Sequence, residues 1–183
     1  MTEHIWLRPL TETDLGLAEV LYEDPAEAGQ YGFFGYFPGV LRRNWAEDRL
    51  IGSDHGNLAI VRGTRAGGAG GAGGVFVGEV GWYKEKCGPT SFCWSIGIGL
   101  LNVERGKGYG TEAQRQIAAY LFAHTQFNRI EASTESTNTA EQRSLEKAGF
   151  TREGIRRGAL FRAGTWRDLV VYSVLRSEVT LPD

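Results

Sequence analysis

A glycine-rich turn near the middle of the chain has the composition of an anion-binding site. Arg105, Gly106, Gly108 and Gly110 follow a short apolar run, and an apolar pattern with helical spacing begins at Thr111. The first backbone N–H groups of a helix have no partner within the helix and lie at the positive end of its dipole. Because glycine carries no side chain, a phosphate can approach these groups closely. Arg105 adds a positive charge and Thr111 a hydroxyl, so the stretch predicts a phosphate site.

The spacing of this turn differs from two common phosphate-binding motifs. Lys107 is followed by Gly108 and Tyr109 rather than by Ser or Thr, as a P-loop would require. The glycines are spaced G-x-G-x-G, whereas a dinucleotide fold has G-x-G-x-x-G. Arg105, Gly108 and Gly110 instead resemble the Arg/Gln-x-x-Gly-x-Gly/Ala signature of the GNAT acyl-CoA N-acyltransferases.

Two later segments support the same resemblance. Residues 138–150, NTAEQRSLEKAGF, and the Arg-Glu-Gly at 152–154 are similar to a segment of the RimJ/RimL-like branch of that family. Trp-Arg-Asp at 166–168, ahead of the apolar run at 170–175, resembles the closing strand of this branch. The resemblance covers roughly residues 95–175 and implies an N-acyltransferase that uses acetyl-CoA as its acyl donor.

The resemblance also implies which residues bind coenzyme A. The turn at 105–111 would bind the pyrophosphate, and the backbone at 100–103 would pair with the pantetheine arm. Asn138 would hydrogen-bond that arm, although capping of the following helix suits it equally well. The predicted coenzyme-binding residues are Leu100, Leu101, Val103, Arg105, Gly106, Lys107, Gly108, Tyr109, Gly110, Thr111 and Asn138.

Acyl transfer to an amine also requires removal of a proton. An alkylamine with a pKa near 10.4 is neutral about once in 2,500 at pH 7, a penalty of roughly 4.6 kcal/mol. Glu79, in Gly-Glu-Val-Gly on an expected central strand, and Glu135, after the strand at 129–133, are the candidate bases. A solvated carboxylate on the polar face of its strand is the simpler interpretation of Glu79. The family commonly has a serine where this chain has Glu141, so its usual proton donor to the leaving group cannot be transferred.

Aromatic residues after the first expected helix are candidates for the acceptor site. Residues 29–38 combine glycines with five aromatics and follow the acidic residues Glu23, Asp24 and Glu27. Aromatic walls with nearby carboxylates suit a compact cation. The predicted substrate-binding residues are Tyr31, Phe33, Phe34, Tyr36 and Trp82. Closure of the core is the alternative role for these rings, and core packing is the simplest role for Trp82.

Three functions are compatible with these features. The favoured one is acetylation of a primary amine on a small molecule, with aminoglycoside-type antibiotics among the candidates. The second is acetylation of protein N-termini, as in ribosomal-protein acetyltransferases. The third, from another class, is a non-catalytic sensor that binds coenzyme A.

The expected elements form a mixed α/β fold of the α+β type. Apolar patterns predict strands at 5–9, 58–61, 75–82, 91–100, 129–133, 150–161 and 166–175. Helices are expected at 11–23, 41–50, 111–124 and 139–148, with loops at 29–38 and in the glycine-rich stretch 63–74. We expect a single domain over residues 1–183: one central sheet of about seven strands, flanked by helices, with the splayed strand pair of the GNAT fold.

Composition limits the partners. The net charge of −2 and the absence of a basic tract argue against nucleic acid. No apolar run approaches the roughly 18 residues that cross a membrane, and the N-terminus has no secretory pattern. Cys87 and Cys93 lack the further ligands of a zinc site, so no metal is predicted. Free thiols are expected, with a disulfide between the two as the alternative. These features predict a cytoplasmic enzyme with a small-molecule partner, and with a homodimer as one option.

Overall fold

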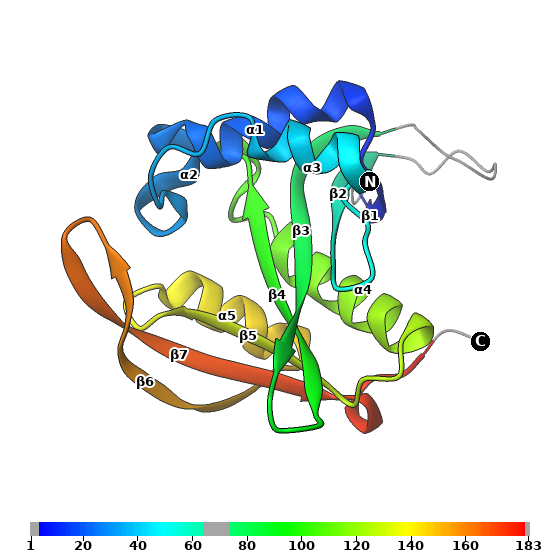
Figure 1. Cartoon of the computed structure of the whole chain (residues 1–183), viewed down its shortest axis with the longest axis vertical. Coiled ribbons are helices and arrows are strands. Elements are labelled where there is room, and N and C mark those ends of the chain that lie inside the picture. The colour runs from blue at the N-terminus through cyan, green and yellow to red at the C-terminus, as the bar shows by residue number, and fades with distance from the viewer. Residues whose placement is uncertain (1–3, 64–73, 182–183) are drawn as a thin grey trace.

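The protein is built on one seven-stranded sheet. The computed structural model describes residues 4–63 and 74–181, so the glycine-rich stretch lies outside the described residues except at its two ends. The strand order is β1-β2-β3-β4-β5-β7-β6, which confirms the predicted mixed sheet (Figure 1). The strands are β1 His4–Pro9, β2 His55–Gly63, β3 Val75–Lys86, β4 Phe92–Leu100, β5 Arg129–Glu135, β6 Thr151–Arg162 and β7 Thr165–Leu175.

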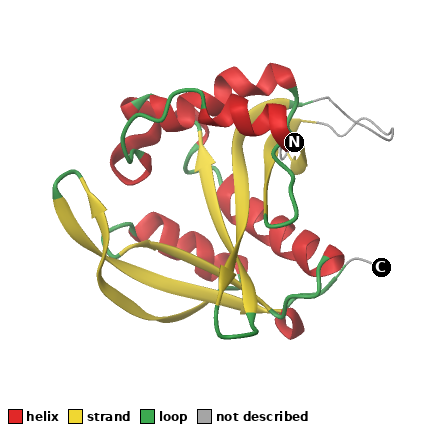
Figure 2. Ribbon diagram, viewed as in Figure 1, coloured by secondary structure: helices red, strands yellow, loops and turns green. Residues whose placement is uncertain are grey.

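Helices cover both faces of the sheet (Figure 2). One apolar cluster joins α1 to β1–β3 on one face, and a larger cluster joins α4 and α5 to the other face. The helices are α1 Leu15–Glu23, α2 Pro25–Gly32, α3 Val40–Asp48, α4 Tyr109–His124 and α5 Thr139–Ala148. Among the described residues, none of these helices is long and apolar enough to cross a membrane.

The pairing between β4 and β5 is unusually short. These parallel strands are in register only at Trp94–Ile130, Ser95–Glu131 and Ile96–Ala132. β4 then continues to Leu100 and β5 to Glu135 without pairing with each other, and Figure 1 shows them separating. The connection through α4 makes the strands parallel, so their carboxyl ends lie at the same side of the sheet. The starts of α4 and α5 therefore both lie near the point of separation.

The expected loop at 29–38 is wrong in its first part. Pro25 opens α2 instead of only ending α1, and the Asp24 carboxylate caps the new helix by accepting a hydrogen bond of 2.8 Å from Ala26 N. Proline fits the first helical position because the N–H it lacks would have no partner there. Gly29 has a φ of +68° and kinks α2. Tyr31 is therefore on a helix, whereas the aromatics from residue 33 onward follow it.

We predict that Gly56→Ala will lower the free energy of unfolding by roughly 1–3 kcal/mol. A Cβ atom at Gly56 would lie 2.1 Å from the ring of the buried Trp82, so the ring would have to move within the core. Gly97→Ala on β4 is the matched control, because a Cβ there meets nothing within 4 Å. Urea denaturation measures both. Equal midpoints for the two variants would contradict this packing.

Candidate active site

The glycine-rich turn has the conformation that an anion site needs. Gly106 and Gly108 have φ values of +75° and +84°, and Gly108 is the N-cap of α4. The helix begins at Tyr109, two residues before the predicted start, and its first bond runs from Glu112 N to Gly108 O at 3.2 Å. A Cβ atom at Gly106 or Gly108 would meet nothing within 4 Å. The backbone here is open to a ligand, which is the property expected for phosphate binding.

The polar side chains of the turn already have protein partners. Arg105 donates from Nε to Leu100 O at 2.9 Å and from Nη2 to Glu27 O, so it joins the turn to β4 and α2. Lys107 Nζ lies 2.9 Å from a Glu104 carboxylate oxygen. The Thr111 hydroxyl is 3.0 Å from Ser144 Oγ on α5. Backbone groups therefore form the open part of the turn in this structure.

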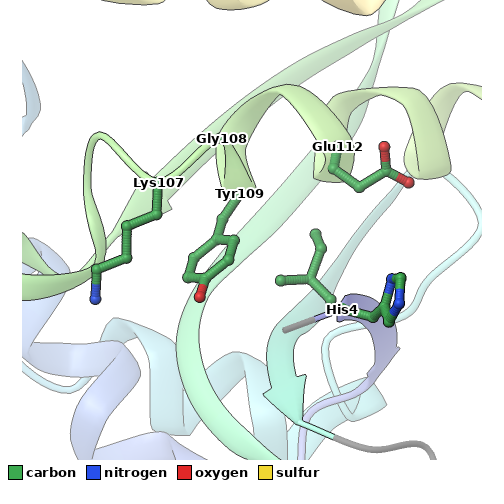
Figure 3. A pocket seen from close by; sticks show the side chains of 6 residues that line it. His4, Lys107, Gly108, Tyr109 and Glu112 are labelled. Carbon is green, nitrogen blue, oxygen red and sulfur yellow. The ribbon is translucent and has the colours of Figure 1, made fainter. Parts of the chain in front are cut away.

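A shallow pocket of about 230 Å³ lies beside the turn. Figure 3 shows Tyr109 between Lys107 on one side and His4 with Glu112 on the other. Neither His4 nor Glu112 was predicted as a site residue, and more than a hundred residues separate His4 from the turn. The pocket is smaller than typical small-molecule sites of about 300–1,000 Å³. Its size and its charged walls suit one polar group rather than a whole ligand.

Asn138 has the capping geometry that the sequence left open. Its Oδ1 accepts a hydrogen bond of 3.3 Å from Glu141 N, and its Nδ2 donates to Thr134 Oγ1 at 3.0 Å. These bonds fix the start of α5 against the end of β5. A role in binding coenzyme A stays a prediction.

The predicted strand edge at Leu100 and Leu101 is half-buried, and Val103 is exposed.

Glu79 is a buried carboxyl with one oxygen unpaired. Its exposed fraction is 3 %, and Asn57 Nδ2 donates to Oε1 at 3.1 Å. Oε2 has no hydrogen-bond partner within residues 4–63 and 74–181. Burial raises the pKa of this carboxyl to about 8. Glu79 lies opposite Gly99, near the end of β4 that separates from β5.

Glu135, the second predicted base, is in a different environment. Its carboxylate forms an ion pair with Arg162, a residue of β6 that the sequence analysis did not single out, and both side chains are buried. The Arg162 guanidinium also lies over the rings of Tyr31 and Phe34, at 5.4 and 5.8 Å. The Glu135 carboxylate is engaged by a cation, whereas one oxygen of Glu79 has no partner among the described residues, so Glu79 is the stronger candidate base.

Two of the predicted acceptor residues, Tyr31 and Phe34, lie against Arg162. The Tyr31 hydroxyl donates to Thr137 O at 3.0 Å, and Phe33 contacts Tyr36 edge to face at 5.2 Å. Phe34 and Tyr36 are exposed. Trp82 is not placed with them: it is 6 % exposed and packs in the core on the α4 face. Side chains alternate along a strand, so Trp82 and Glu79, three residues apart, point to opposite faces.

The acidic residues near these aromatics serve the local backbone. Glu23 accepts a hydrogen bond from Gly39 N, Asp24 from Ala26 N and Glu27 from Asn102 N. The sequence analysis expected these carboxylates to face a cationic acceptor. Each one helps to fix a turn or a helix start, and its role toward a cationic acceptor stays a prediction.

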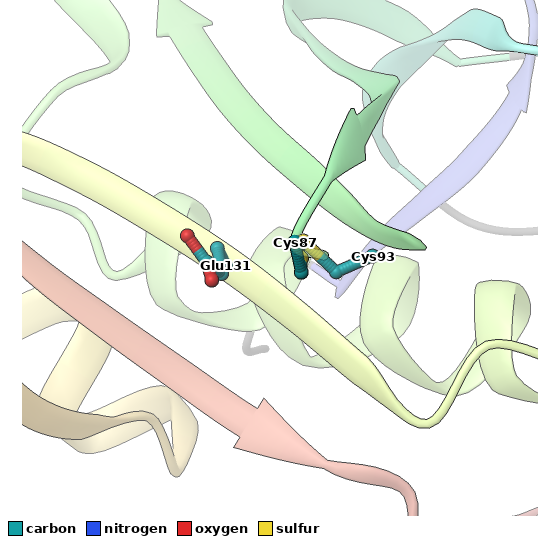
Figure 4. A group of neighbouring side chains, drawn as sticks. All are labelled: Cys87, Cys93 and Glu131. Carbon is teal, nitrogen blue, oxygen red and sulfur yellow. Dashed lines mark hydrogen bonds between the residues drawn. The ribbon is translucent and has the colours of Figure 1, made fainter. Parts of the chain in front are cut away.

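A cluster of Cys87, Cys93 and Glu131 lies apart from these residues (Figure 4). The two sulfur atoms are 2.6 Å apart, and burial raises the pKa of the Cys93 thiol. The Glu131 carboxylate, which the sequence analysis did not connect with the cysteines, bonds Arg129 at 2.8 Å and Arg156 at 3.4 Å. These cations compete with any metal ion for the carboxylate, so we assign the cluster no part in the chemistry.

Comparison with known proteins identifies related sequences. Residues 4–151 match the family model described as an acetyltransferase (GNAT) domain. YjcK of Bacillus subtilis, described as an N-acetyltransferase, is 40 % identical over 83 residues, which span 45 % of this chain and 46 % of YjcK. YdaF of the same organism, described as a ribosomal N-acetyltransferase, is 26 % identical over 97 % of this chain and 94 % of its own length. A kanamycin resistance protein of Rhizobium radiobacter is 32 % identical over 74 residues, 40 % of this chain and 67 % of that protein.

Solved structures share the fold. A spermidine N-acetyltransferase from Vibrio cholerae, in complex with coenzyme A and spermine, superposes with a TM-score of 0.75 at 15 % identity over 95 % of this chain and 96 % of that one. RimJ of Mycobacterium smegmatis, in complex with CoA-disulfide, superposes with a TM-score of 0.69 at 21 % identity, over 98 % of this chain and 84 % of that one. The match to the family model over most of the chain, together with this fold and turn, shows that the protein belongs to the GNAT acetyltransferase family.

Proposed function

We propose that the protein is an acetyl-CoA-dependent N-acetyltransferase that acts on a primary amine of a small molecule, with aminoglycoside-type antibiotics among the candidate acceptors. The observation that carries this proposal is the Glu79 carboxyl, which is buried, has an unpaired oxygen and lies near the free end of β4. A carboxyl in this state is costly to bury, and amine deprotonation gives it a function.

The donor site rests on the turn and on the separated strands. Residues 105–111 would bind the coenzyme A pyrophosphate through backbone N–H groups. The unpaired ends of β4 and β5 would admit the pantetheine arm, and the backbone at 100–103 would bond to it. Holding thioester and amine together can supply roughly 7–11 kcal/mol of the barrier reduction in favourable cases. Arg105 Nε donates a hydrogen bond to the Leu100 carbonyl oxygen in this structure. The Arg105 side chain would have to turn away before coenzyme A could bond to that oxygen.

The raised pKa makes Glu79 a suitable base for an alkylamine. Moving a proton from an ammonium of pKa near 10.4 to an ordinary glutamate costs roughly 8 kcal/mol. With a carboxyl pKa of about 8, the cost falls to roughly 3 kcal/mol. Ionising the carboxyl at pH 7 adds only about 1.4 kcal/mol. Burial therefore favours deprotonation by Glu79 overall.

Contacts between α2 and the β6–β7 hairpin favour a small acceptor. Tyr31 reaches Thr137 O, and Arg162 lies against Tyr31 and Phe34, so α2 meets both the β5–α5 connection and the end of β6. This bridge narrows the space in which an extended peptide would lie. The similarity to a kanamycin resistance protein points in the same direction.

Acetylation of protein N-termini is the second candidate. The alignment with YdaF runs over nearly the whole chain, whereas the alignment with the kanamycin resistance protein covers 40 % of it. An α-amine with a pKa near 7.8 would need less help from a base than an alkylamine. A coenzyme A sensor without turnover is the third candidate, and it would leave the unpaired carboxyl of Glu79 without a function.

We predict that Gly108→Val will weaken acetyl-CoA binding more than tenfold, because the new side chain would occupy the space that the phosphate needs. Gly149→Val is the matched control: Gly149 has a φ of +98° and open surroundings, so it carries similar backbone strain away from the turn. Isothermal titration calorimetry on the folded variants gives both affinities. An unchanged affinity for Gly108→Val would show that the phosphate binds elsewhere.

Glu79→Gln should lower kcat by roughly 10²-fold with little change in acetyl-CoA affinity, because Glu79 acts on the amine. At higher pH, the deficit in kcat/KM relative to the wild type should shrink, because more of the free amine is already neutral. Glu85→Gln, on the same strand, should retain wild-type kcat. Wild-type kcat in Glu79→Gln at pH 7 would exclude Glu79 as the base.

The same variant should change the pH dependence of stability. The pKa of Glu79 is raised from 4.5 to about 8, so the folded state binds more protons than the unfolded state between these values. Wild-type stability should therefore fall as pH rises from about 4.5 through 8, and Glu79→Gln should remove much of this decline. Urea midpoints at pH 5, 7 and 9 measure it. Parallel declines in both proteins would contradict the raised pKa.

A panel of amines tests the acceptor. Release of the coenzyme A thiol should be faster with aminoglycosides than with N-terminal peptides at equal concentration, after subtraction of acetyl-CoA hydrolysis without acceptor. Turnover of peptides but of no aminoglycoside would establish the second candidate function instead.

A further inference from the structure

A chain of hydrogen bonds connects the starts of α4 and α5. Thr111 Oγ1 lies 3.0 Å from Ser144 Oγ, and Ser144 Oγ donates to Gln114 Oε1 at 3.0 Å. Gln114 Nε2 then donates to Glu141 Oε1 at 2.5 Å. Gln114 is 1 % exposed, so its amide is held in the core between the two helices. The chain leads from the residue beside the phosphate turn to a single carboxyl on α5.

Glu141 lies beside the gap between β4 and β5. Asn138 ties the first turn of α5 to Thr134 on β5, and Gln114 ties Glu141 to α4. One turn further along α5, Ser144 lies against Gly110: a Cβ atom added to this glycine would be 3.5 Å from Ser144 Oγ. Glu141 is half-buried at this place.

The surroundings of Glu141 favour its protonated form. Burial raises the pKa of the carboxyl to about 7, and the hydrogen bond from Gln114 lowers it only in part. The start of a helix ordinarily stabilises a negative charge, so the cost of burial outweighs that effect here. At neutral pH, the Glu141 carboxyl therefore carries a proton in about half of the molecules.

Charged groups on the neighbouring elements are engaged with other partners. On β5, Glu135 pairs with Arg162, and Glu131 pairs with Arg129 and Arg156. On α4, Arg115 bonds Glu112 and reaches Lys147 O at the far end of α5. On β6, Glu153 pairs with Arg129, and on α5 itself Glu146 accepts from Tyr172. The Glu141 carboxyl, by contrast, accepts its hydrogen bond from the uncharged Gln114.

We propose that Glu141 donates a proton to the sulfur of coenzyme A as the thioester bond breaks, an inference that rests on the proposed acetyl transfer. The amine nitrogen, neutral after deprotonation by Glu79, bonds to the acetyl carbonyl carbon. The C–S bond breaks and leaves its electron pair on sulfur, which takes the Glu141 proton. The nitrogen and Glu79 each release one proton to water, and water protonates Glu141 again. The ammonium and the thioester have then become the amide, the free thiol and one released proton, so charge and protons balance.

The acid strength of Glu141 suits this step. An alkyl thiol has a pKa near 8.5, so transfer from a carboxyl of pKa about 7 to the thiolate is favourable by roughly 30-fold. A glutamate at its ordinary pKa would be ionised at pH 7 and would carry almost no proton to donate. Glu141 thus supplies the proton donor that the sequence analysis could not assign.

The two carboxyls predict a distinctive pH profile. Glu79 must be ionised and Glu141 protonated, with pKa values of about 8 and about 7. Wild-type kcat at saturating amine should therefore rise to pH 7, stay level to pH 8 and fall above it. In Glu141→Gln, kcat should not fall at alkaline pH and should keep rising through pH 8. In Glu79→Gln, kcat should not rise at acid pH and should fall as the pH increases through 7.

The first test compares two substitutions on the same helix. Glu141→Gln should lower kcat at pH 7 by roughly tenfold to hundredfold. Glu141→Asp, which keeps a carboxyl, should recover part of the loss, and Glu146→Gln should match the wild type. If wild-type protein transfers acetyl to amines but Glu141→Gln equals Glu146→Gln at every pH, the inference is wrong while the proposed function stands. Absence of transfer to any amine by wild-type protein would overturn the proposed function first.

A second test separates proton donation from positioning. Selenolate leaves more readily than thiolate and needs less protonation, so the deficit of Glu141→Gln should shrink at least fivefold with acetyl-selenocoenzyme A. An equal deficit with both donors would make Glu141 a structural residue. Urea midpoints provide a readout without turnover: wild-type stability should decline between pH 4.5 and 7 more than that of Glu141→Gln, because the folded carboxyl holds its proton longer. Equal declines would contradict the proton-holding state.

Discussion

The site depends on the early separation of β4 from β5. Three residue pairs hold these parallel strands together, and beyond Ile96 and Ala132 each strand end lacks its neighbour on that side. Unpaired backbone groups are costly to bury, so such an edge persists where solvent or a ligand can satisfy it. The outer partners hold the strands apart, since β3 pairs with β4 to its end and β7 pairs with β5 to Glu135. Because the strands are parallel, the helices that follow them start beside the same gap.

Three glutamates near this gap show how surroundings decide the state of a carboxyl. Glu135 is buried against Arg162 and forms an ion pair with it. Glu79 and Glu141 accept hydrogen bonds from uncharged amides instead, and burial raises the pKa of each. In the proposed mechanism, Glu79 on β3 is the base and Glu141 on α5 is the acid. The difference between these two carboxyls and Glu135 lies in their partners rather than in residue type.

Local sequence patterns predicted most helices and strands, whereas contacts between residues far apart in the sequence could not be predicted from them. The bounds of α5 were predicted to the residue, because Asn138 and Gly149 mark its two ends. Helix α2 was missed because proline and glycine usually interrupt helices, although Pro25 here begins one. Asn57, Gln114 and Arg162 contact Glu79, Glu141 and Glu135 across 22 to 27 positions of sequence, and no local spacing reveals such pairs. The strand that carries Trp82 was predicted correctly, but the face of the sheet to which this side chain points was not, so Trp82 was wrongly predicted to bind substrate.

Hydrogen exchange measured with and without acetyl-CoA tests the central claim most directly, because it locates the donor without requiring an acceptor. If the thioester arm enters the gap, exchange should slow at the end of β4, through the turn at 97–111 and around the start of α5, while the β3–β4 hairpin at 87–92 stays unchanged. Gly108→Val should lose this protection in proportion to its lost affinity. Protection confined to α2 and the aromatic residues after it, with the turn and the strand ends unaffected, would contradict the account.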